Sequence, residues 1–197
     1  HICAVMQVPR FELSLTDSQQ EVRRSIQSIC DKFNHEYWRD HASDGTYPQE
    51  FVDALGTEGW LGALIPQEYG GKGLSTAETV VMMEEIAASG AGFGGAQTVH
   101  GGVYNSPPLV KNANESHRQT LLPKVASGEV SIQAFGLTEP GAGSNAPDMS
   151  TSAERDGDEF VISGQKMWIS RVDVSDYMLL VARTTPKSEL EKNSRGI

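Results

Sequence analysis

Hydrophobic residues follow a helical period in the first part of the chain. Four of them recur at intervals of four, three and four residues, namely Val22, Ile26, Ile29 and Phe33. This spacing places their side chains on one face of an α-helix, and the charged and amide residues between them form the opposite face. Thr16 and Gln19 have the spacing of a capping box, so we expect the helix to begin just after Thr16.

The next segments combine a short helix with a glycine-rich loop. Pro48 suits the first position of a helix with a short apolar stripe, which Gly56 or Gly59 can end. Residues 67–73 show no apolar period, so we expect a loop there. Twelve of the 20 glycines lie between Gly56 and Gly102, which indicates close helix–helix approach and tight turns.

Two more helices are indicated further along the chain. Ser75 and Glu78 form a second capping box, and the run that follows is typical of a buried or half-buried helix through Val80, Met83, Glu84 and Ala87. Ser116 and Gln119 have the spacing of a third capping signal. Gly128 can end the helix that follows it.

After residue 128 the pattern changes to short segments typical of strands. Asp156-Gly157 is a strong hairpin signal between residues 151–155 and residues 160–162. Ser163-Gly164 makes a second turn before a short strand over residues 167–170, and residues 177–183 predict a further strand. Short strands separated by Gly and Asp are typical of a small antiparallel sheet or barrel.

These two patterns divide the chain into two domains of an α+β protein. We expect an N-terminal all-α helical domain over residues 11–128 and an antiparallel β-sheet or barrel domain over residues 129–197. Residues 195–197 resemble the start of another strand, and a sheet that ended there would have unpaired edges. We therefore expect the β domain to be incomplete in this sequence.

Composition excludes several classes of function. The chain has 26 acidic and 16 basic residues, and its net charge of −10 makes nucleic acid and anionic membranes poor partners. The longest apolar run is residues 177–182, whereas a membrane span needs about 20 residues. Cys3 and Cys30 are too few for a disulfide framework, and the histidines lack the spacing of metal ligands. We expect a soluble protein that is not secreted, with Cys30 as a small buried residue.

Two segments carry candidate chemistry. Residues 134–145 contain a Pro-Gly-x-Gly-Ser turn whose amides can bind a pyrophosphate, with Ser144 as a further donor; the alternative is a plain tight turn. In residues 164–170, strand geometry would place Trp168 and Ser170 on the same face, toward one planar ligand. The alternative, which the pattern alone favours, is that Trp168 belongs to the core and Ser170 to a strand end.

Together these two segments resemble signature stretches of the acyl-CoA dehydrogenase family of flavoenzymes. Residues 59–74, Leu122-Pro123 and the Asp156-Gly157 hairpin match in the same order, so the resemblance extends from about residue 11 to residue 197. It implies a helical domain, a middle β domain and a C-terminal helical bundle, with FAD between the last two. It also implies a homotetramer or dimer in fatty acid metabolism that oxidises an acyl-CoA to the 2,3-enoyl-CoA. Electrons would pass to electron-transferring flavoprotein, in a bacterial cytoplasm or the mitochondrial matrix.

The resemblance implies roles for individual residues. The cofactor-binding positions match Phe135, Leu137, Thr138, Gly143, Ser144, Trp168, Ile169 and Ser170. The Thr138 hydroxyl would donate toward the N1/O2 side of the flavin, and Ser144 would also approach the substrate's pantetheine arm. His100 is a candidate for substrate binding, and the alternative is a packing histidine. Phe135 and Ser170 stand where many members have Tyr and Thr, and Asn145 stands where Asp is common.

We assign no catalytic base within this chain. The family's base is a glutamate on the C-terminal bundle, which we expect outside this sequence. Glu139 is interpreted as a structural residue rather than a replacement base, and Glu84-Glu85 as part of a solvated helix face. An acyl-CoA oxidase or flavin monooxygenase of the same fold remains an alternative, as does a catalytically silent domain that binds no FAD.

Overall fold

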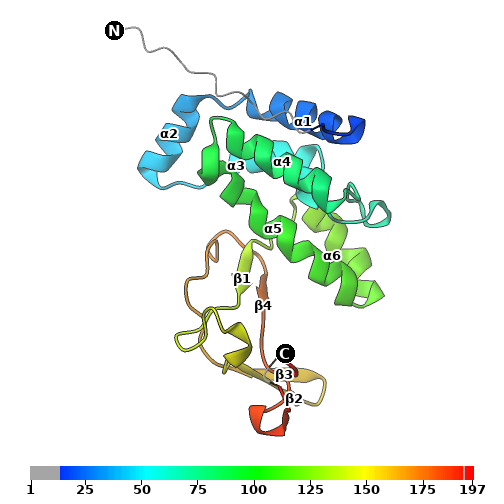
Figure 1. The fold of residues 1–197 in the computed structure, drawn as a ribbon, viewed down its shortest axis with the longest axis vertical. Coiled ribbons are helices and arrows are strands. Elements are labelled where there is room, and N and C mark those ends of the chain that lie inside the picture. The colour runs from blue at the N-terminus through cyan, green and yellow to red at the C-terminus, as the bar shows by residue number, and fades with distance from the viewer. Residues whose placement is uncertain (1–13, 193) are drawn as a thin grey trace.

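The computed structural model describes residues 14–192 and 194–197, in which helices precede strands along the chain (Figure 1). The α-helices are α1 (Asp17–Cys30), α2 (His35–Asp44), α3 (Gln49–Thr57), α4 (Thr76–Ala88), α5 (Gly92–Asn112) and α6 (Glu115–Ser127). The strands are β1 (Ala134–Gly136), β2 (Ser152–Asp156), β3 (Glu159–Ser163) and β4 (Met178–Leu180). The prediction of a helical part followed by a small β part is confirmed. Cys3 and the other N-terminal positions lie outside the described residues.

α1 follows the prediction closely. The Gln19 backbone N–H donates to Thr16 Oγ1 at 3.2 Å, and the Thr16 N–H donates to Gln19 Oε1 at 3.0 Å, so the capping box is present. The helix buries Val22, Ile26, Ile29 and Cys30. Phe33 lies beyond the end of the helix and is half-buried, in edge-to-face contact with Phe51 of α3 at 5.3 Å between ring centroids. The apolar stripe therefore continues past the helix into the same core.

The capping box of α4 and its half-buried character are confirmed, but of the four residues in the predicted run Met83 packs against the core whereas Val80, Glu84 and Ala87 are exposed. Val80 is 59% exposed, and the residues that α4 buries are Thr79, Val81, Met82, Glu85 and Ile86. α4 packs against α1 and α5, which together select its buried face. Its apolar residues run almost all round the helix, so their spacing could not distinguish one face from the other.

Of the two adjacent glutamates on α4, one is exposed to solvent and the other is buried in the core. Glu84 is exposed, as expected for a solvated face, whereas Glu85 is buried with 5% of its surface exposed. Glu85 lies 3.3 Å from Arg23 Nε and accepts a hydrogen bond from Gln27 Nε2 at 2.9 Å. The solvated interpretation is therefore wrong for Glu85, because polar groups on α1 satisfy its charge inside the helical core.

The predicted start of α6 is two residues late. Asn114 caps the helix, and its Oδ1 accepts a hydrogen bond from the His117 N–H at 2.8 Å. Ser116 therefore lies inside the first turn, because Asn reaches the free N–H groups as well as Ser does. The predicted end is confirmed, since Gly128 has φ +81° and terminates the helix.

Two helices were not predicted. α2 is polar and fully buries none of its residues, and α5 runs for 21 residues through glycines and through Pro107 and Pro108.

The close helix approach predicted from the glycines is present at Gly62, where an added Cβ would lie 2.6 Å from the Ala126 Cβ of α6. At Gly101 of α5 it would lie 2.4 Å from the Gln133 carbonyl oxygen, so α5 approaches the backbone that leads into β1.

The β part forms two small pairs rather than one sheet. β2 and β3 form the predicted antiparallel hairpin, with Asp156 opposite Glu159 and Gly157 at φ +61°. β1 and β4, in contrast, pair in parallel, which corrects the expectation of an antiparallel arrangement throughout. Both strands start from one anchor, where the Ser131 N–H donates to the Asp176 carboxylate at 2.8 Å, and they leave it in the same direction.

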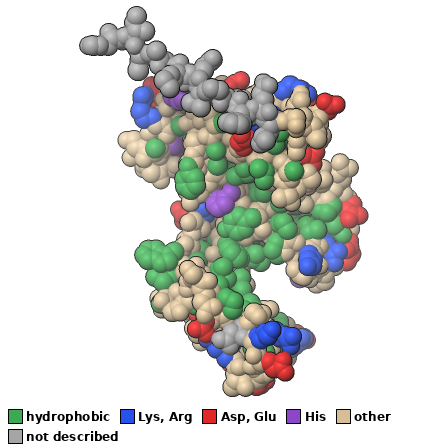
Figure 2. All heavy atoms as spheres, in the orientation of Figure 1, with side chains coloured by type: hydrophobic (Ala, Val, Ile, Leu, Met, Phe, Trp, Pro, Cys, Tyr) green, Lys and Arg blue, Asp and Glu red, His purple; other side chains and the backbone are tan. Residues whose placement is uncertain are grey.

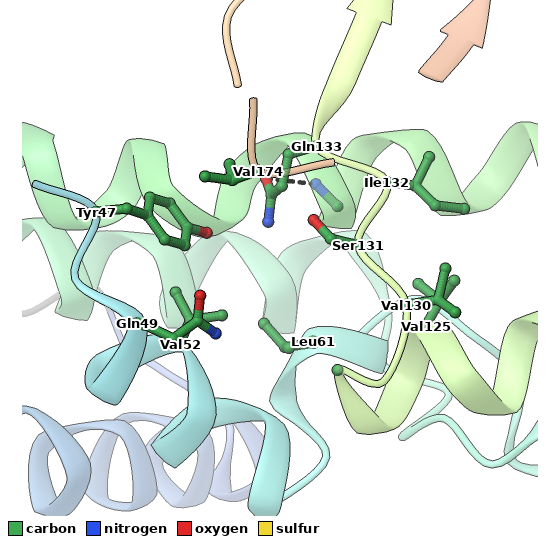
Figure 3. Close-up of a pocket in the computed structure, with 12 residues that line it drawn as sticks. Tyr47, Gln49, Val52, Leu61, Val125, Val130, Ser131, Ile132, Gln133 and Val174 are labelled. Atoms are coloured by element: carbon green, nitrogen blue, oxygen red, sulfur yellow. Dashed lines mark hydrogen bonds between the residues drawn. The ribbon is translucent and has the colours of Figure 1, made fainter. Parts of the chain in front are cut away.

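Residues 130–133 join the helical part to the β part (Figure 3). Gln133 Oε1 accepts a hydrogen bond from the Gly102 N–H at 3.0 Å, and the buried Asn105 Nδ2 donates to the Ile132 and Ala134 carbonyls at 2.8 and 3.2 Å. Figure 3 shows Gln133 facing Tyr47 of the helical part across a small hollow. These hydrogen bonds hold α5 next to the start of β1. In Figure 2, hydrophobic side chains gather across the middle of the molecule, over the region where α5 meets β1.

Candidate functional site

A cavity of about 220 Å³ lies between α5, β1 and a loop that ends at Arg171. Its lining comprises Gln97, His100 and Tyr104 of α5, then Gln133, Phe135, Leu137 and Thr138 in and around β1, and finally Trp168, Ile169, Ser170 and Arg171 of the loop. Seven of the nine residues singled out from the sequence therefore line one cavity. The other two, Gly143 and Ser144, lie on a separate exposed turn.

Hydrogen bonds hold the loop beside the end of β1. The Met167 N–H donates to the Thr138 carbonyl at 2.9 Å, and Lys166 Nζ donates to the Leu137 carbonyl at 3.0 Å. Both anchors immediately precede Trp168 in the chain. They bring the Thr138 hydroxyl and the loop side chains to the same cavity, although the two segments are distant in sequence.

Trp168 corrects two expectations drawn from the pattern. It is 82% exposed rather than a core residue, and its φ of 60° breaks the predicted strand over residues 167–170. A bulky residue rarely adopts positive φ, and such conformations concentrate at binding sites. Trp168 and Ser170 nevertheless line the same cavity, so their proximity arises from a loop and not from strand alternation.

Side chains of α5 form the opposite wall. The Tyr104 ring packs edge-on against Phe135, with 5.6 Å between centroids, and His100 lies 5.1 Å from Tyr104. His100 Nδ1 is 3.1 Å from the Gln97 carbonyl, which only accepts, so Nδ1 carries the proton and Nε2 remains for a ligand. Burial raises the pKa of the Tyr104 phenol, which therefore stays neutral and can donate a hydrogen bond at neutral pH.

Gln97, Tyr104, Gln133 and Arg171 were not identified from the sequence. Gln97, His100 and Tyr104 are spaced three and four residues apart, which is one face of a helix. That signal could have been recognised had the glycine- and proline-containing segment been assigned to a helix. Gln133 and Arg171 have no comparable pattern, because the tertiary fold alone brings them to the cavity.

Glu139 is not part of the cavity lining, and several donors hold its carboxylate. The Ser150 and Thr151 N–H groups donate to its carboxylate at 2.6 and 2.9 Å, and Lys166 Nζ lies 2.9 Å away. Burial alone would raise the pKa of this carboxyl, but these donors outweigh it and hold the pKa far below its usual range. A carboxylate that is buried, ion-paired and this weakly basic is a structural group, as the sequence suggested.

Gly143 and Ser144 follow a tight turn at Pro140-Gly141 and do not line the cavity. Glu139 and Ala142 close that turn through mutual backbone hydrogen bonds of 3.1 and 3.2 Å, and Ala142 is buried. Gly143 and Ser144 are exposed, and an added Cβ on Gly143 would meet no atom within 4 Å. The segment at Gly143 and Ser144 thus presents open backbone to solvent, an arrangement that leaves amide groups accessible to an anion.

Metal centres and membrane spans are two further classes of feature that bear on function. Residues 14–192 and 194–197 contain no cluster of three or more His, Cys, Asp and Glu side chains arranged to hold a metal ion. In the same residues, no helix combines the length and the apolar character that crossing a membrane requires.

Comparison with known families gives two matches along the chain. The family described as acyl-CoA dehydrogenase, N-terminal domain, matches residues 16–129, and acyl-CoA dehydrogenase, middle domain, matches residues 134–197. Together they account for nearly all of the described residues.

Individual relatives give the same result. The chain is 33% identical to acyl-CoA dehydrogenase FadE26 of Mycobacterium tuberculosis over 95% of its own length and 47% of the relative's. It is 33% identical to mitochondrial isovaleryl-CoA dehydrogenase of Bos taurus over 86% and 40% of the two lengths. The structure of butyryl-CoA dehydrogenase from Megasphaera elsdenii matches with a TM-score of 0.78 at 27% identity, over 90% of this chain and 47% of the other. The chain thus spans about half the length of the curated relatives it matches.

Proposed function

This chain belongs to the acyl-CoA dehydrogenase family, and from that premise we propose that it is part of an FAD-dependent enzyme that oxidises an acyl-CoA to the 2,3-enoyl-CoA. In this proposal the chain supplies one side of the flavin site and one wall of the acyl pocket. The single observation that carries it is the meeting of Phe135, Leu137, Thr138 and the loop 168–170 at one cavity.

The residues present suit a flavin ring. An 82% exposed indole at Trp168 offers an apolar plane, and the Thr138 and Ser170 hydroxyls offer donors beside it. When bound, FAD would supply the hydride-accepting chemistry that no amino-acid side chain provides. Trp168, Ile169 and Ser170 would contact the ring system, and the open turn at Gly143 and Ser144 would bind the pyrophosphate.

Within this proposal, Thr138 would hold the cofactor by donating a hydrogen bond to the part that carries negative charge in its reduced form. Such preorganised donors stabilise developing charge without rearrangement. His100 and Tyr104 line the side of the cavity formed by α5, where the acyl group would lie, with His100 Nε2 and the Tyr104 hydroxyl as polar groups toward it.

Among the described residues no carboxylate lines the cavity, so in this proposal the α-proton goes to a base from elsewhere. Glu139 already accepts hydrogen bonds from Ser150 and Thr151 and pairs with Lys166, and its depressed pKa makes it a poor proton acceptor. We therefore propose that the base is a carboxylate contributed from outside these 197 residues, and that electrons leave to an electron-transferring flavoprotein or a similar acceptor.

FAD binding is the direct test. Titrating the chain with FAD should quench flavin fluorescence saturably, and Thr138→Val should weaken that binding. One hydrogen bond to a charged group contributes about 1.5–3 kcal/mol, which is roughly a tenfold to hundredfold loss of affinity. Thr120→Val on α6, whose hydroxyl bonds only within its own helix, is the matched control. A chain that binds no FAD would support the silent-domain alternative instead.

The reaction class needs a second assay on an enzyme that contains the base. An acyl-CoA dehydrogenase should reduce an artificial electron acceptor and consume little oxygen. Peroxide formed in proportion to the enoyl product would favour an acyl-CoA oxidase of the same fold over the dehydrogenase.

A further inference from the structure

A second and larger cavity, of about 560 Å³, lies between α2, the turn that leads into α5 and the side chain of Arg171. Arg171 lines this cavity and also the 220 Å³ cavity described above, so the two are neighbours. Nothing in the proposed oxidation uses the larger one. Its volume falls within the range of sites that bind small organic molecules, about 300–1,000 Å³.

Positive charge converges on this cavity. Four of its lining residues are His35, Arg39, His41 and Arg171, and none of its lining residues is Asp or Glu. The chain as a whole has ten more acidic than basic residues, so an acid-free lining with two arginines departs from the average surface. The acidic partner of His41 is Glu50, which lies 3.8 Å from His41 Nε2 and has a side chain that is 71% exposed.

Neither arginine forms an ion pair in the described part of the chain. Over the described residues, Arg39 and Arg171 have no carboxylate oxygen within 4.0 Å, whereas Arg23, Arg24 and Arg118 each pair with a glutamate. Uncompensated arginines facing one concave surface create a positive potential that attracts anions. A guanidinium presents a planar set of donors that matches a carboxylate or a phosphate.

Arg171 is also held in place. Its backbone has φ +63°, a conformation that only a few per cent of non-glycine residues adopt. Its guanidinium lies 5.2 Å from the centroid of the Tyr47 ring, and the Tyr47 hydroxyl donates to the Thr98 carbonyl at 2.9 Å. A residue kept in an unfavourable backbone conformation, with its side chain on a fixed ring, is typical of ligand-binding positions.

We propose that this cavity binds a small organic oxyanion, a carboxylate or phosphate group held by the Arg39 and Arg171 guanidiniums with His35 and His41 beside it. Two arginines supply both charge and paired donors, and the imidazoles of His35 and His41 line the same cavity. The N-terminal turn of α5 borders the cavity, and its dipole adds to the same positive potential.

Nuclear magnetic resonance of the histidine side chains tests the proposal on the 197-residue chain. Glutarate represents the carboxylate source and inorganic phosphate the phosphate source, and sodium chloride at equal ionic strength measures non-specific effects. We expect at least one of the two anions to shift the His35 and His41 imidazole resonances saturably, and the anion that saturates at lower concentration identifies the source. If neither shifts them beyond the chloride control, the proposal is wrong.

Variants locate the site. Arg39→Gln combined with Arg171→Asn should weaken binding at least tenfold, and Asn tolerates the positive φ at position 171. Arg24→Gln, which removes one charge from the exposed face of α1, should leave binding unchanged. Should the double variant not fold, Arg39→Gln alone should still weaken binding several-fold, because Arg39 is an exposed residue of α2. Binding as tight as in the unmodified chain would overturn the assignment.

Discussion

The buried pair of Glu139 and Lys166 gives the sharpest test of how the cavity is built. The two side chains are 3% and 7% exposed and lie 2.9 Å apart. Lys166 also donates to the Leu137 carbonyl at 3.0 Å, and so connects the end of β1 to the loop that carries Trp168. Replacing Glu139 by Gln leaves the Lys166 ammonium buried without its counter-ion.

The expected cost is large for a single substitution. Removing one partner of a buried ion pair typically destabilises a protein by about 3–5 kcal/mol, because the remaining charge is left uncompensated. The amide that the Glu139→Gln substitution introduces would also present donors where the Ser150 and Thr151 N–H groups now donate to a carboxylate. Glu139→Gln together with Lys166→Met should recover part of this loss, by about 0.5–3 kcal/mol, since neither charge remains.

Amide hydrogen exchange measures the effect where it acts. The amides of Ser150 and Thr151 report on opening around Glu139, and a loss of about 3–5 kcal/mol should speed their exchange roughly 100-fold to 5,000-fold. The matched control is Glu129→Gln. Glu129 lies 2.7 Å from Lys124, but both side chains are about half exposed, so its loss should cost less than about 1 kcal/mol.

A small effect would contradict this reasoning. If Glu139→Gln speeds exchange at these two amides by no more than Glu129→Gln does, the buried pair does not hold the loop against β1. If the double variant is as unstable as the sum of the two single variants, the two charges do not interact through their contact.

Three further outcomes are expected. Because the pKa of Glu139 is depressed in the folded chain, its contribution to stability is complete above the ordinary glutamate pKa of about 4.3 and is lost as pH falls below it. The free energy of unfolding of Glu139→Gln, measured in urea, should therefore fall less on acidification below that pH than the free energy of the unmodified chain does. Gly101→Ala should destabilise by about 1–3 kcal/mol because its Cβ would lie 2.4 Å from a backbone oxygen, whereas Gly94→Ala, with open space around it, should stabilise α5 by up to about 1 kcal/mol in urea unfolding. Asn114→Ala should lower the free energy of unfolding by about 1 kcal/mol because the helix loses its cap, while Ser116→Ala should change thermal stability little. If Ser116→Ala were the more destabilising of the two, the cap would lie at Ser116, as the sequence predicted.

Local signals in the sequence were sufficient to predict those structures whose stabilising contacts lie within one short segment. The capping boxes at Thr16 and Ser75 satisfy N–H groups within the same turn, and the Asp156-Gly157 hairpin joins adjacent strands, so all three could be recognised from short motifs. The same holds for Gly128, whose freedom to adopt positive φ ends α6.

Helices without a regular apolar stripe were missed. α2 fully buries no side chain, and the glycines of α5 remove the apolar periodicity while allowing its backbone to approach Gln133. α5 is stable because it packs against α4, α6 and β1, and these contacts are formed by residues distant in sequence. For the same reason the buried face of α4, and with it the burial of Glu85, could not be assigned.

The sequence by itself determined the order of helical and β parts, the starts of α1 and α4, the end of α6 and the types of residue present around β1, because these depend on neighbours within a few positions. Only the tertiary structure decided that α5 and the loop of Trp168 meet β1 at one cavity, that β1 and β4 run in parallel, and that Arg171 stands between two cavities. Those features depend on contacts between segments tens of residues apart, and a local pattern contains no information about which distant segment will compensate a charge or fill a space.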